Sequence, residues 1–417
     1  QDFVYSLSRL ANRELVSPGR WVLDYFNIDN VVALNDTVLE INLPTPFPGF
    51  LGLLTMNYFS FVPKEAIDFF GDSFSSNPIG TGPFYLKKWE PSEKLILLKN
   101  SQYFEFEKNV RLPYLDGVSI SFITQKESVF MNFFLDNFDF ISGLDNSFRD
   151  ELINIEGELY DLYKNRFSIL STPYLNTEYL GVHLPKVIHE NSPLMYKDFR
   201  RALNYCFNKS IMVKYLRNGL VYPANYGFVP VALKSCYSIE SNILSKDSIK
   251  KLLLKIPNKS HEIILNTTSD YLDVCEYIQH SALEFGINIK LEISSPAVHR
   301  DLFSSGNASL FRASWIADYP DPENFLSLFY SKNKSPIGPN YTHFHNELYD
   351  SLYQQSFIIG DMDLRCEMFK KMELVLLDEF VVIPLYYDYV FRLVSNRIKG
   401  MSLNSMNSLC LKRVQKL

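Results

Sequence analysis

Apolar and polar residues alternate along the chain with the periods expected of strands and helices. The clearest pattern lies between residues 261 and 315, where three short apolar runs are separated by two amphipathic segments. It predicts strands over 261–267, 287–293 and 309–315, with helices over 270–285 and 296–303. Because a strand–helix–strand order makes successive strands parallel, we expect one parallel sheet that is covered by helices.

A second pattern of the same kind lies earlier in the chain. Val118, Ile120 and Phe122 alternate with serines, and a helical segment and another short apolar run follow. This predicts a β-α-β unit over 118–142, which in one sheet should be right-handed. A long strand is expected over 174–184, between the two patterns. The sequence therefore predicts two α/β lobes joined by extended segments, with ligands collecting in the crevice at the strand ends.

The remaining elements follow from shorter signals. Helices are expected over 2–13, 63–70, 196–219, 348–358 and 363–377, strands over 37–43, 84–89, 94–99 and 381–385, and an irregular tail from 399. Gly80-Thr81-Gly82 only superficially resembles a phosphate-binding loop, because the G-x-x-x-x-G-K-[ST] pattern is missing and a hairpin follows. The segment is interpreted as a turn.

Composition narrows the classes of function. A chain of 417 residues suggests two or three domains, and 47% hydrophobic with 21% charged residues is typical of globular proteins. A net charge of −6 without a basic run argues against nucleic acid. There is no apolar stretch of about eighteen residues. No signal region opens the sequence at Gln1, so either a targeting segment has been removed or the chain begins inside its natural sequence.

Cysteines and histidines give no metal motif. None of the five cysteines lies in a C-x-x-C spacing, so zinc and redox motifs are unsupported, and the compartment stays open. His343 and His345 would share one face of a strand and could hold a metal. A polar loop is the favoured interpretation, because no third ligand is evident nearby. We expect no metal and no cofactor.

Opposite charges flank the end of the last predicted strand. Arg312 offers a planar fork for a carboxylate, and Asp318 can bind an amine through a charge-assisted hydrogen bond. A zwitterionic peptide needs both, and the strand between them can add backbone pairing. The alternative is a structural turn capped by Asp318, with Arg312 paired inside one lobe. The spacing alone leaves the two interpretations even.

Catalysis has weaker support. Asp318, Asp321 and Glu323 could take part in general acid–base chemistry, but they share one short loop, whereas glycosidase pairs flank a bond from opposite sides. Neither G-x-S-x-G nor H-E-x-x-H occurs. We expect no catalytic residues and no enzymatic activity.

Several motifs together resemble the extracellular solute-binding proteins of family 5, the oligopeptide- and dipeptide-binding subunits of ABC importers. In the family's order they are Asp2–Leu10, Asn77–Phe84 with Trp89, Asn100–Tyr103, Arg200–Tyr205, Trp315–Phe325 and Ile383–Tyr387. Phe84 stands where the family's GTGPY turn has a tyrosine. The resemblance covers nearly the whole chain.

The resemblance implies roles for individual residues. Asp318 would anchor the α-amino group of a peptide, and Arg312 would match an arginine that meets a ligand carboxylate. Trp315 would line a side-chain pocket. Ser314 and Ile316 would pair with the peptide backbone.

The resemblance also implies a class II periplasmic-binding-protein-like fold, α/β and two-lobed, with mixed sheets flanked by helices and a partial accessory subdomain. We expect the accessory remnant over 1–76, lobe I over 77–180, lobe II over 181–390 and a return segment over 391–417. Tyr387 would join the cleft wall. The family's opening strands, which complete the first lobe and supply part of the opposite cleft wall, lie before the segment seen in this sequence.

The expected function follows from this likeness. The chain would capture short peptides in an interlobe cleft and deliver them to ABC transporter permease subunits. It would act as a monomer in the periplasm or, as a lipoprotein, at the outer face of the cytoplasmic membrane; no signal or lipid-anchor segment is present in the sequence. The alternatives are a non-peptide solute such as a nickel chelate, an opine or an oligosaccharide, a sensory or chaperone role, and a hydrolase.

Overall fold

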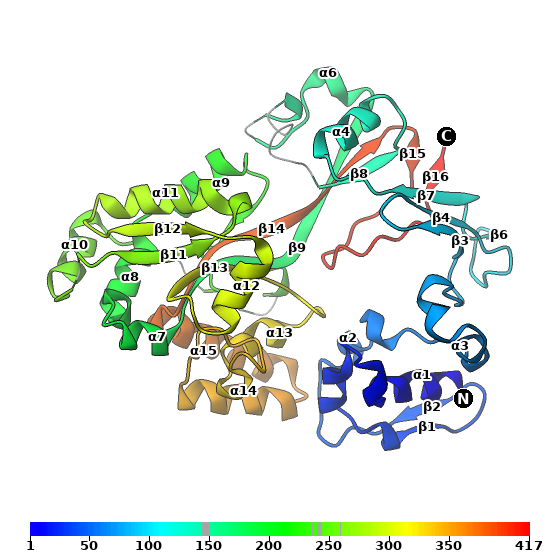
Figure 1. The fold of residues 1–417 in the computed structure, drawn as a ribbon, viewed down its shortest axis with the longest axis horizontal. Helices are drawn as coiled ribbons and strands as arrows, with labels where there is room; N and C mark the ends of the chain where they lie inside the picture. The colour runs from blue at the N-terminus through cyan, green and yellow to red at the C-terminus, as the bar shows by residue number, and fades with distance from the viewer. Residues whose placement is uncertain (144–150, 155, 235–236, 240–242, 259) are drawn as a thin grey trace. The chain divides into compact units, whose positions relative to one another are not determined.

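The computed structural model describes residues 1–143, 151–154, 156–234, 237–239, 243–258 and 260–417. The chain divides into two compact units. Unit 1 holds Gln1–Asn154, Glu158–Thr172 and Val390–Leu417, and unit 2 holds Pro173–Tyr389 with the short segment 155–157. The boundaries fall inside two long strands, β9 (Phe167–Val182) and β14 (Val382–Ser395), which are labelled in Figure 1. The lobe boundary expected between residues 180 and 181 lies in the same strand, β9.

The first part of unit 1 is mostly helical. Its elements are α1 (Asp2–Ala11), β1 (Val31–Ala33), β2 (Leu39–Ile41), α2 (Phe50–Leu53) and α3 (Lys64–Phe70), with short 3-10 turns between them. α1 buries Leu7 and Leu10 on one face, which confirms the predicted amphipathic helix. β1 and β2 form an antiparallel pair.

A three-stranded antiparallel sheet forms the next part of unit 1. It has the order β3-β4-β7, with β3 (Phe84–Glu90), β4 (Lys94–Lys99) and β7 (Gly117–Ser121). The predicted hairpin is confirmed, and the turn before it is held by the Asn100 Nδ2 group, which donates to the Gly82 carbonyl at 3.0 Å. Among the described residues, unit 1 also holds β5 (Phe106–Glu107), β6 (Val110–Arg111), α4 (Lys126–Phe134), β8 (Phe140–Ser142), α6 (Asp161–Lys164), β15 (Ile398–Lys399) and β16 (Gln415–Lys416).

Two sequence predictions for unit 1 are wrong. β7 and β8 belong to different sheets, so residues 118–142 are not a β-α-β unit within one sheet. β8 pairs instead with β14, at the other end of the sequence, and a local pattern cannot reveal such a partner. The tail is also more regular than expected, because β15 and β16 pair with each other.

A seven-stranded mixed sheet carries unit 2. Its order is β10-β14-β9-β13-β11-β12, and β8 also pairs with β14. The strands not yet introduced are β10 (Tyr222–Pro223), β11 (Ile263–Thr267), β12 (Ile289–Ile293) and β13 (Leu310–Ile316). β11 is parallel to both β12 and β13, which confirms the parallel arrangement predicted for 261–315, whereas β13 runs antiparallel to β9.

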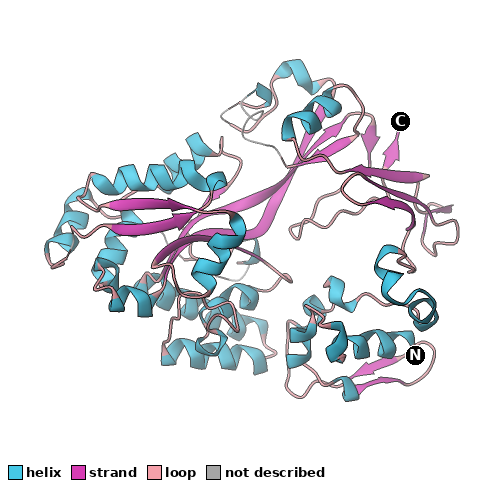
Figure 2. Ribbon diagram, viewed as in Figure 1, coloured by secondary structure: helices cyan, strands magenta, loops and turns pink. Residues whose placement is uncertain are grey.

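Helices flank the strands of unit 2, as Figure 2 shows. They are α7 (Leu184–His189), α8 (Lys197–Tyr205), α9 (Lys209–Leu216), α10 (Lys246–Leu254), α11 (Leu272–Leu283), α12 (Pro296–Ser304), α13 (Pro322–Leu326), α14 (Glu347–Ile358) and α15 (Met362–Glu379). The single helix predicted over 196–219 is wrong. It breaks before α9 because Asn208 is the N-cap, its side chain accepting from the Ile211 N–H at 3.0 Å.

The core of unit 2 lies between the central strands and these helices. Leu180, Leu265 and Leu310, on three adjacent strands, are fully buried together with Val274 and Ile278 of α11. Burial of this kind is the main stabilising term for such a unit. Among the described residues, no helix has both the length and the apolar character needed to cross a bilayer.

Candidate functional site

The last residues of β13 present part of their backbone away from β9. Ser314 stands opposite Glu178 and Ile316 opposite Asn176 in the antiparallel register. The Ala317 N–H donates to the Leu175 carbonyl at 2.8 Å, which identifies a hydrogen-bonded pair. Such pairs alternate along antiparallel strands. The N–H and C=O groups of Ser314 and Ile316 therefore point to the opposite edge of β13.

That opposite edge is open beyond Phe311. β11 pairs with β13 only at Leu310 and Phe311, and in the described chain no further strand continues this edge. The Arg312 carbonyl accepts from His299 Nε2 at 2.7 Å, so the open stretch begins after it. Ser314 is exposed and Ile316 is 49% exposed. An extended ligand can add to an edge of this kind through backbone hydrogen bonds.

Asp318 follows β13 and is half-buried. Asn324 of α13 holds the turn: its Oδ1 accepts from the Asp318 N–H at 3.1 Å, and its Nδ2 donates to Asp318 Oδ2 at 3.2 Å. Burial raises the pKa of Asp318, and only the Asn324 hydrogen bond opposes that effect. No cationic side chain of the described residues forms an ion pair with it. The site therefore offers a partly desolvated anion that lacks a counter-charge.

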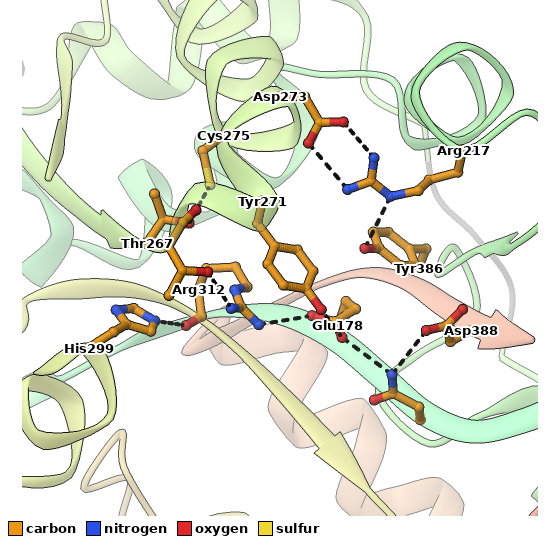
Figure 3. Close-up of polar contacts among 12 residues, drawn as sticks. Glu178, Arg217, Thr267, Tyr271, Asp273, Cys275, His299, Arg312, Tyr386 and Asp388 are labelled. Atoms are coloured by element: carbon orange, nitrogen blue, oxygen red, sulfur yellow. Dashed lines mark hydrogen bonds and ion pairs between the residues drawn. The ribbon is translucent and has the colours of Figure 1, made fainter. Parts of the chain in front are cut away.

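Arg312 is paired inside unit 2. Its Nη1 lies 3.3 Å from Glu178 Oε2, and its Nη2 donates to Thr268 Oγ1 at 3.2 Å. The guanidinium carbon lies 3.5 Å from the centre of the Tyr271 ring, a cation–π contact (Figure 3). The sequence left open whether Arg312 meets a ligand or is paired within its own lobe. The structure shows Arg312 paired with Glu178 of its own unit. A contact between Arg312 and a ligand carboxylate stays a prediction.

Glu178 is the centre of this polar network. It is fully buried, and burial raises its pKa to about 7 against the attraction of Arg312. Its Oε1 accepts from Asn176 Nδ2 at 3.2 Å and from the Tyr271 hydroxyl at 3.3 Å. The same Asn176 amide donates to Asp388 Oδ2 at 3.4 Å. The carboxylates of Glu178 and Asp388, both labelled in Figure 3, therefore share one donor. These contacts join two carboxylates, of Glu178 and Asp388, and one guanidinium, of Arg312.

Trp315 and Tyr387 occupy different surroundings. Trp315 is half-buried, and its indole Nε1 donates to Asn324 Oδ1 at 2.9 Å, on the same amide that holds Asp318. Tyr387 is only 3% exposed, and its hydroxyl donates to the Gly227 carbonyl at 2.7 Å. Trp315 is thus next to Asp318, whereas the Tyr387 hydroxyl is engaged in the fold. Their roles as ligand contacts stay predictions.

The other loop carboxylates serve the fold. Asp321 caps α13 and accepts hydrogen bonds from both terminal nitrogens of Arg365, at 2.7 and 3.1 Å. Glu323 is fully buried and accepts from the hydroxyls of Tyr319 and Tyr353. With these side chains engaged inside unit 2, the loop offers no pair of free carboxylates for acid–base chemistry.

The histidine pair is divided between two surroundings. His343 Nε2 contacts Ser335, and its ring packs against His183 with centroids 4.5 Å apart, whereas His345 lies 3.8 Å from Asp350. The residues lie in a loop, as the favoured interpretation of the sequence had it. Within the described ranges, no group of three histidine, cysteine or acidic side chains is positioned to hold a metal ion.

Sequence reasoning missed the acidic network, although a signal was present. Asn176, Glu178 and Asp388 are polar residues inside two strands whose residues are largely buried. A charged residue in such a strand is rare unless it is paired or used. Tyr271 and Thr268, by contrast, reach the network only through the fold of the loop after β11.

Comparisons with known proteins agree with one another. The family model described as bacterial extracellular solute-binding proteins, family 5 middle, matches residues 1–336 of this chain. The periplasmic oligopeptide-binding protein OppA of Salmonella typhimurium is 26% identical over 431 aligned residues, which cover 96% of this chain and 75% of OppA.

Solved structures share the fold. The substrate-binding protein CtaP of Listeria monocytogenes aligns with a TM-score of 0.84 and 20% identity, covering 100% of this chain and 83% of CtaP. DppA of Helicobacter pylori, in complex with the peptide STSA, aligns with a TM-score of 0.78 and 22% identity, covering 100% and 81%. The chain has the two-lobed, mixed α/β fold of periplasmic binding proteins, as predicted.

Proposed function

The chain belongs to the bacterial extracellular solute-binding proteins of family 5, and from this premise we propose that it captures short peptides for an ABC importer. The family is made up of solute-binding proteins, and its OppA relatives are named as oligopeptide-binding. The peptide would be bound without chemical change and passed to permease subunits in the membrane. Unit 2 supplies the part of the site that can be argued residue by residue.

The observation that carries the proposal is the half-buried carboxylate of Asp318 without a cationic partner in the described chain. An α-ammonium group placed against it would balance its charge. The attraction between the two groups would offset the cost of partly desolvating both. Asn324 fixes the carboxylate through two hydrogen bonds, so little side-chain freedom is lost when a ligand arrives.

The open edge of β13 supports the same ligand class. Ser314 and Ile316 turn unpaired backbone groups outward, four and two residues before Asp318. An extended peptide can pair with these groups while its amino terminus meets the carboxylate. Backbone pairing ignores side-chain identity, so we expect tolerance of many sequences.

The test compares the free and N-acetylated forms of one peptide. The peptide is one that co-purifies with the protein and is identified by native mass spectrometry, or trialanine if none co-purifies. Acetylation removes the terminal charge. A charged hydrogen bond is worth about 1.5 to 3 kcal/mol, or about ten- to hundredfold in Kd. We expect Asp318→Asn to weaken binding of the free peptide by that factor, as measured by calorimetry. Asn keeps an oxygen that can accept from Asn324, so the turn is preserved.

The control is Asp301→Asn, which removes an exposed carboxylate from α12 of the same unit. It should leave both affinities unchanged. Asp318→Asn should change the affinity for the acetylated peptide little, because acetylation has already removed the charged contact. Equal affinities of wild type and Asp318→Asn for the free peptide would refute the amino-terminus contact. No binding of the free peptide to the wild type would favour a non-peptide solute such as an opine or a nickel chelate.

We further propose a location outside the cytoplasm and a monomeric, non-catalytic protein. Relatives are named as periplasmic, and Cys366 is disulfide-bonded, which is typical of oxidising compartments. Intact peptide recovered after incubation, and a single mass for one chain in native mass spectrometry, would support this proposal. Appearance of cleaved peptide would favour a hydrolase.

A further inference from the structure

The open edge of β13 is closed at both of its ends by contacts within unit 2. At one end the Arg312 carbonyl accepts from His299 Nε2 at 2.7 Å. At the other end lies Asp318, whose N–H is held inside the turn. Between them, the backbone groups of Ser314 and Ile316 that face this edge have no hydrogen-bond partner in the described chain. The stretch that a ligand can pair with therefore has a defined length.

His299 is built firmly into unit 2. It lies on α12, its side chain is only 3% exposed, and its ring packs against Phe303 with centroids 5.3 Å apart. Because a carbonyl can only accept, Nε2 carries the proton, and burial lowers the pKa of His299 so that the ring stays neutral. Nδ1 is buried and has no hydrogen-bond partner among the described residues. The bond to the Arg312 carbonyl is thus the polar contact that holds this ring.

The register of a paired peptide follows from the direction of β13. The strand runs toward Asp318, so a peptide with its amino terminus at Asp318 lies antiparallel to it. Antiparallel strands exchange both hydrogen bonds at every second residue. With the first peptide residue opposite Ile316, the third lies opposite Ser314 and the fifth opposite Arg312. The fifth residue would need the carbonyl that His299 already occupies.

His299 also takes the space that a fifth residue would enter. Its Nε2 lies where the backbone nitrogen of a paired strand would lie, since protein N–H···O bonds span about 2.7–3.2 Å. We propose, on the premise that the protein binds peptides, that His299 ends backbone pairing after the third peptide residue. The site would then favour peptides of about three or four residues.

The test measures the affinities of alanine peptides of two to six residues by calorimetry, for the full wild-type chain and for His299→Ala. In the wild type, affinity should rise from two residues to three and should not rise from three to five. His299→Ala frees the Arg312 carbonyl and the space of the ring. It should bind the pentapeptide about two- to tenfold more tightly than the wild type does, which corresponds to one added hydrogen bond. Its affinities for the di- and tripeptide should stay at the wild-type values.

Two further variants separate the role of this contact from a general effect on the fold. His299→Gln should restore the wild-type dependence on length, because a glutamine amide can donate to the same carbonyl. His280→Ala removes an exposed histidine from α11 of the same unit and should change no affinity. Thermal unfolding of each variant checks that the fold is kept.

The possible failures are distinguishable. Wild-type affinity that rises steadily up to five residues would overturn the proposal without any variant. A His299→Ala effect that is absent, or equal at every length, would overturn it while leaving peptide binding intact. No binding of any of these peptides to the wild type would overturn both this inference and the proposed function.

Discussion

Replacing Glu178 by Gln should abolish one specific component of the pH dependence of stability. Burial raises the pKa of Glu178 from 4.5 to about 7. Below about pH 4.5 the acid is protonated in the folded and unfolded states alike. Between pH 4.5 and about 7 the unfolded chain releases this proton while the folded chain keeps it, so stability falls as pH rises.

The size of the effect follows from the two pKa values. The difference between 4.5 and about 7, at 1.36 kcal/mol per pKa unit, corresponds to about 3 kcal/mol. Gln has the shape of the protonated acid and does not titrate. We therefore expect the wild type to lose about 3 kcal/mol more than Glu178→Gln between pH 4.5 and pH 8. A loss of stability caused by the altered contact with Arg312 is the same at both pH values, so it cancels in this difference.

Urea unfolding from pH 4.5 to 8, followed by fluorescence, measures the difference. Replacing Trp21 and Trp89, both in unit 1, by Phe leaves Trp315 as the tryptophan that reports on unit 2. The exposed Glu262→Gln serves as the control and should follow the wild type. Parallel curves for wild type and Glu178→Gln would refute the assignment of a raised pKa to this buried acid.

Three further substitutions test the fold with the same fluorescence assay at pH 7. Arg365→Met should cost about 3–5 kcal/mol, because it leaves the Asp321 carboxylate unpaired in a buried setting; a loss below about 1 kcal/mol would contradict this. Tyr387→Phe removes the bond to the Gly227 carbonyl and should cost about 1–3 kcal/mol, so unchanged stability would show that water replaces the hydroxyl. Gly181→Ala should cost about 1–3 kcal/mol, because its Cβ would lie 2.5 Å from a ring of β13; full stability would mean that the ring shifts freely.

Local patterns predicted those elements whose partners are near in sequence. The parallel strands over 261–315 were predicted correctly because a helix lies in each connection, α11 between β11 and β12 and α12 between β12 and β13. β8 was assigned to the wrong sheet because its partner, β14, lies about 250 residues later. The break at Asn208 was missed because the apolar stripe continues across it, although the asparagine itself is a strong N-cap.

The candidate site shows the same division. Asp318 and Arg312 could be proposed from the sequence because both lie on one strand and the loop after it, and their contacts with a ligand stay predictions. The partner of Arg312 was not, because Glu178 is brought beside it only by the antiparallel pairing of β13 with β9. Whether a charge is free or paired thus depended on strand register, which a single sequence does not contain.

The continuity of β9 and β14 across the unit boundary has a consequence for biosynthesis. Unit 2 is almost one uninterrupted stretch of polypeptide, whereas unit 1 needs Val390–Leu417 to supply partners for β8 and for Glu105. A ribosome releasing the chain from its amino end therefore makes every residue of unit 2 before unit 1 can be completed. The early strands must stay unaggregated during that interval, so escort of the unfolded chain by a chaperone suits this topology.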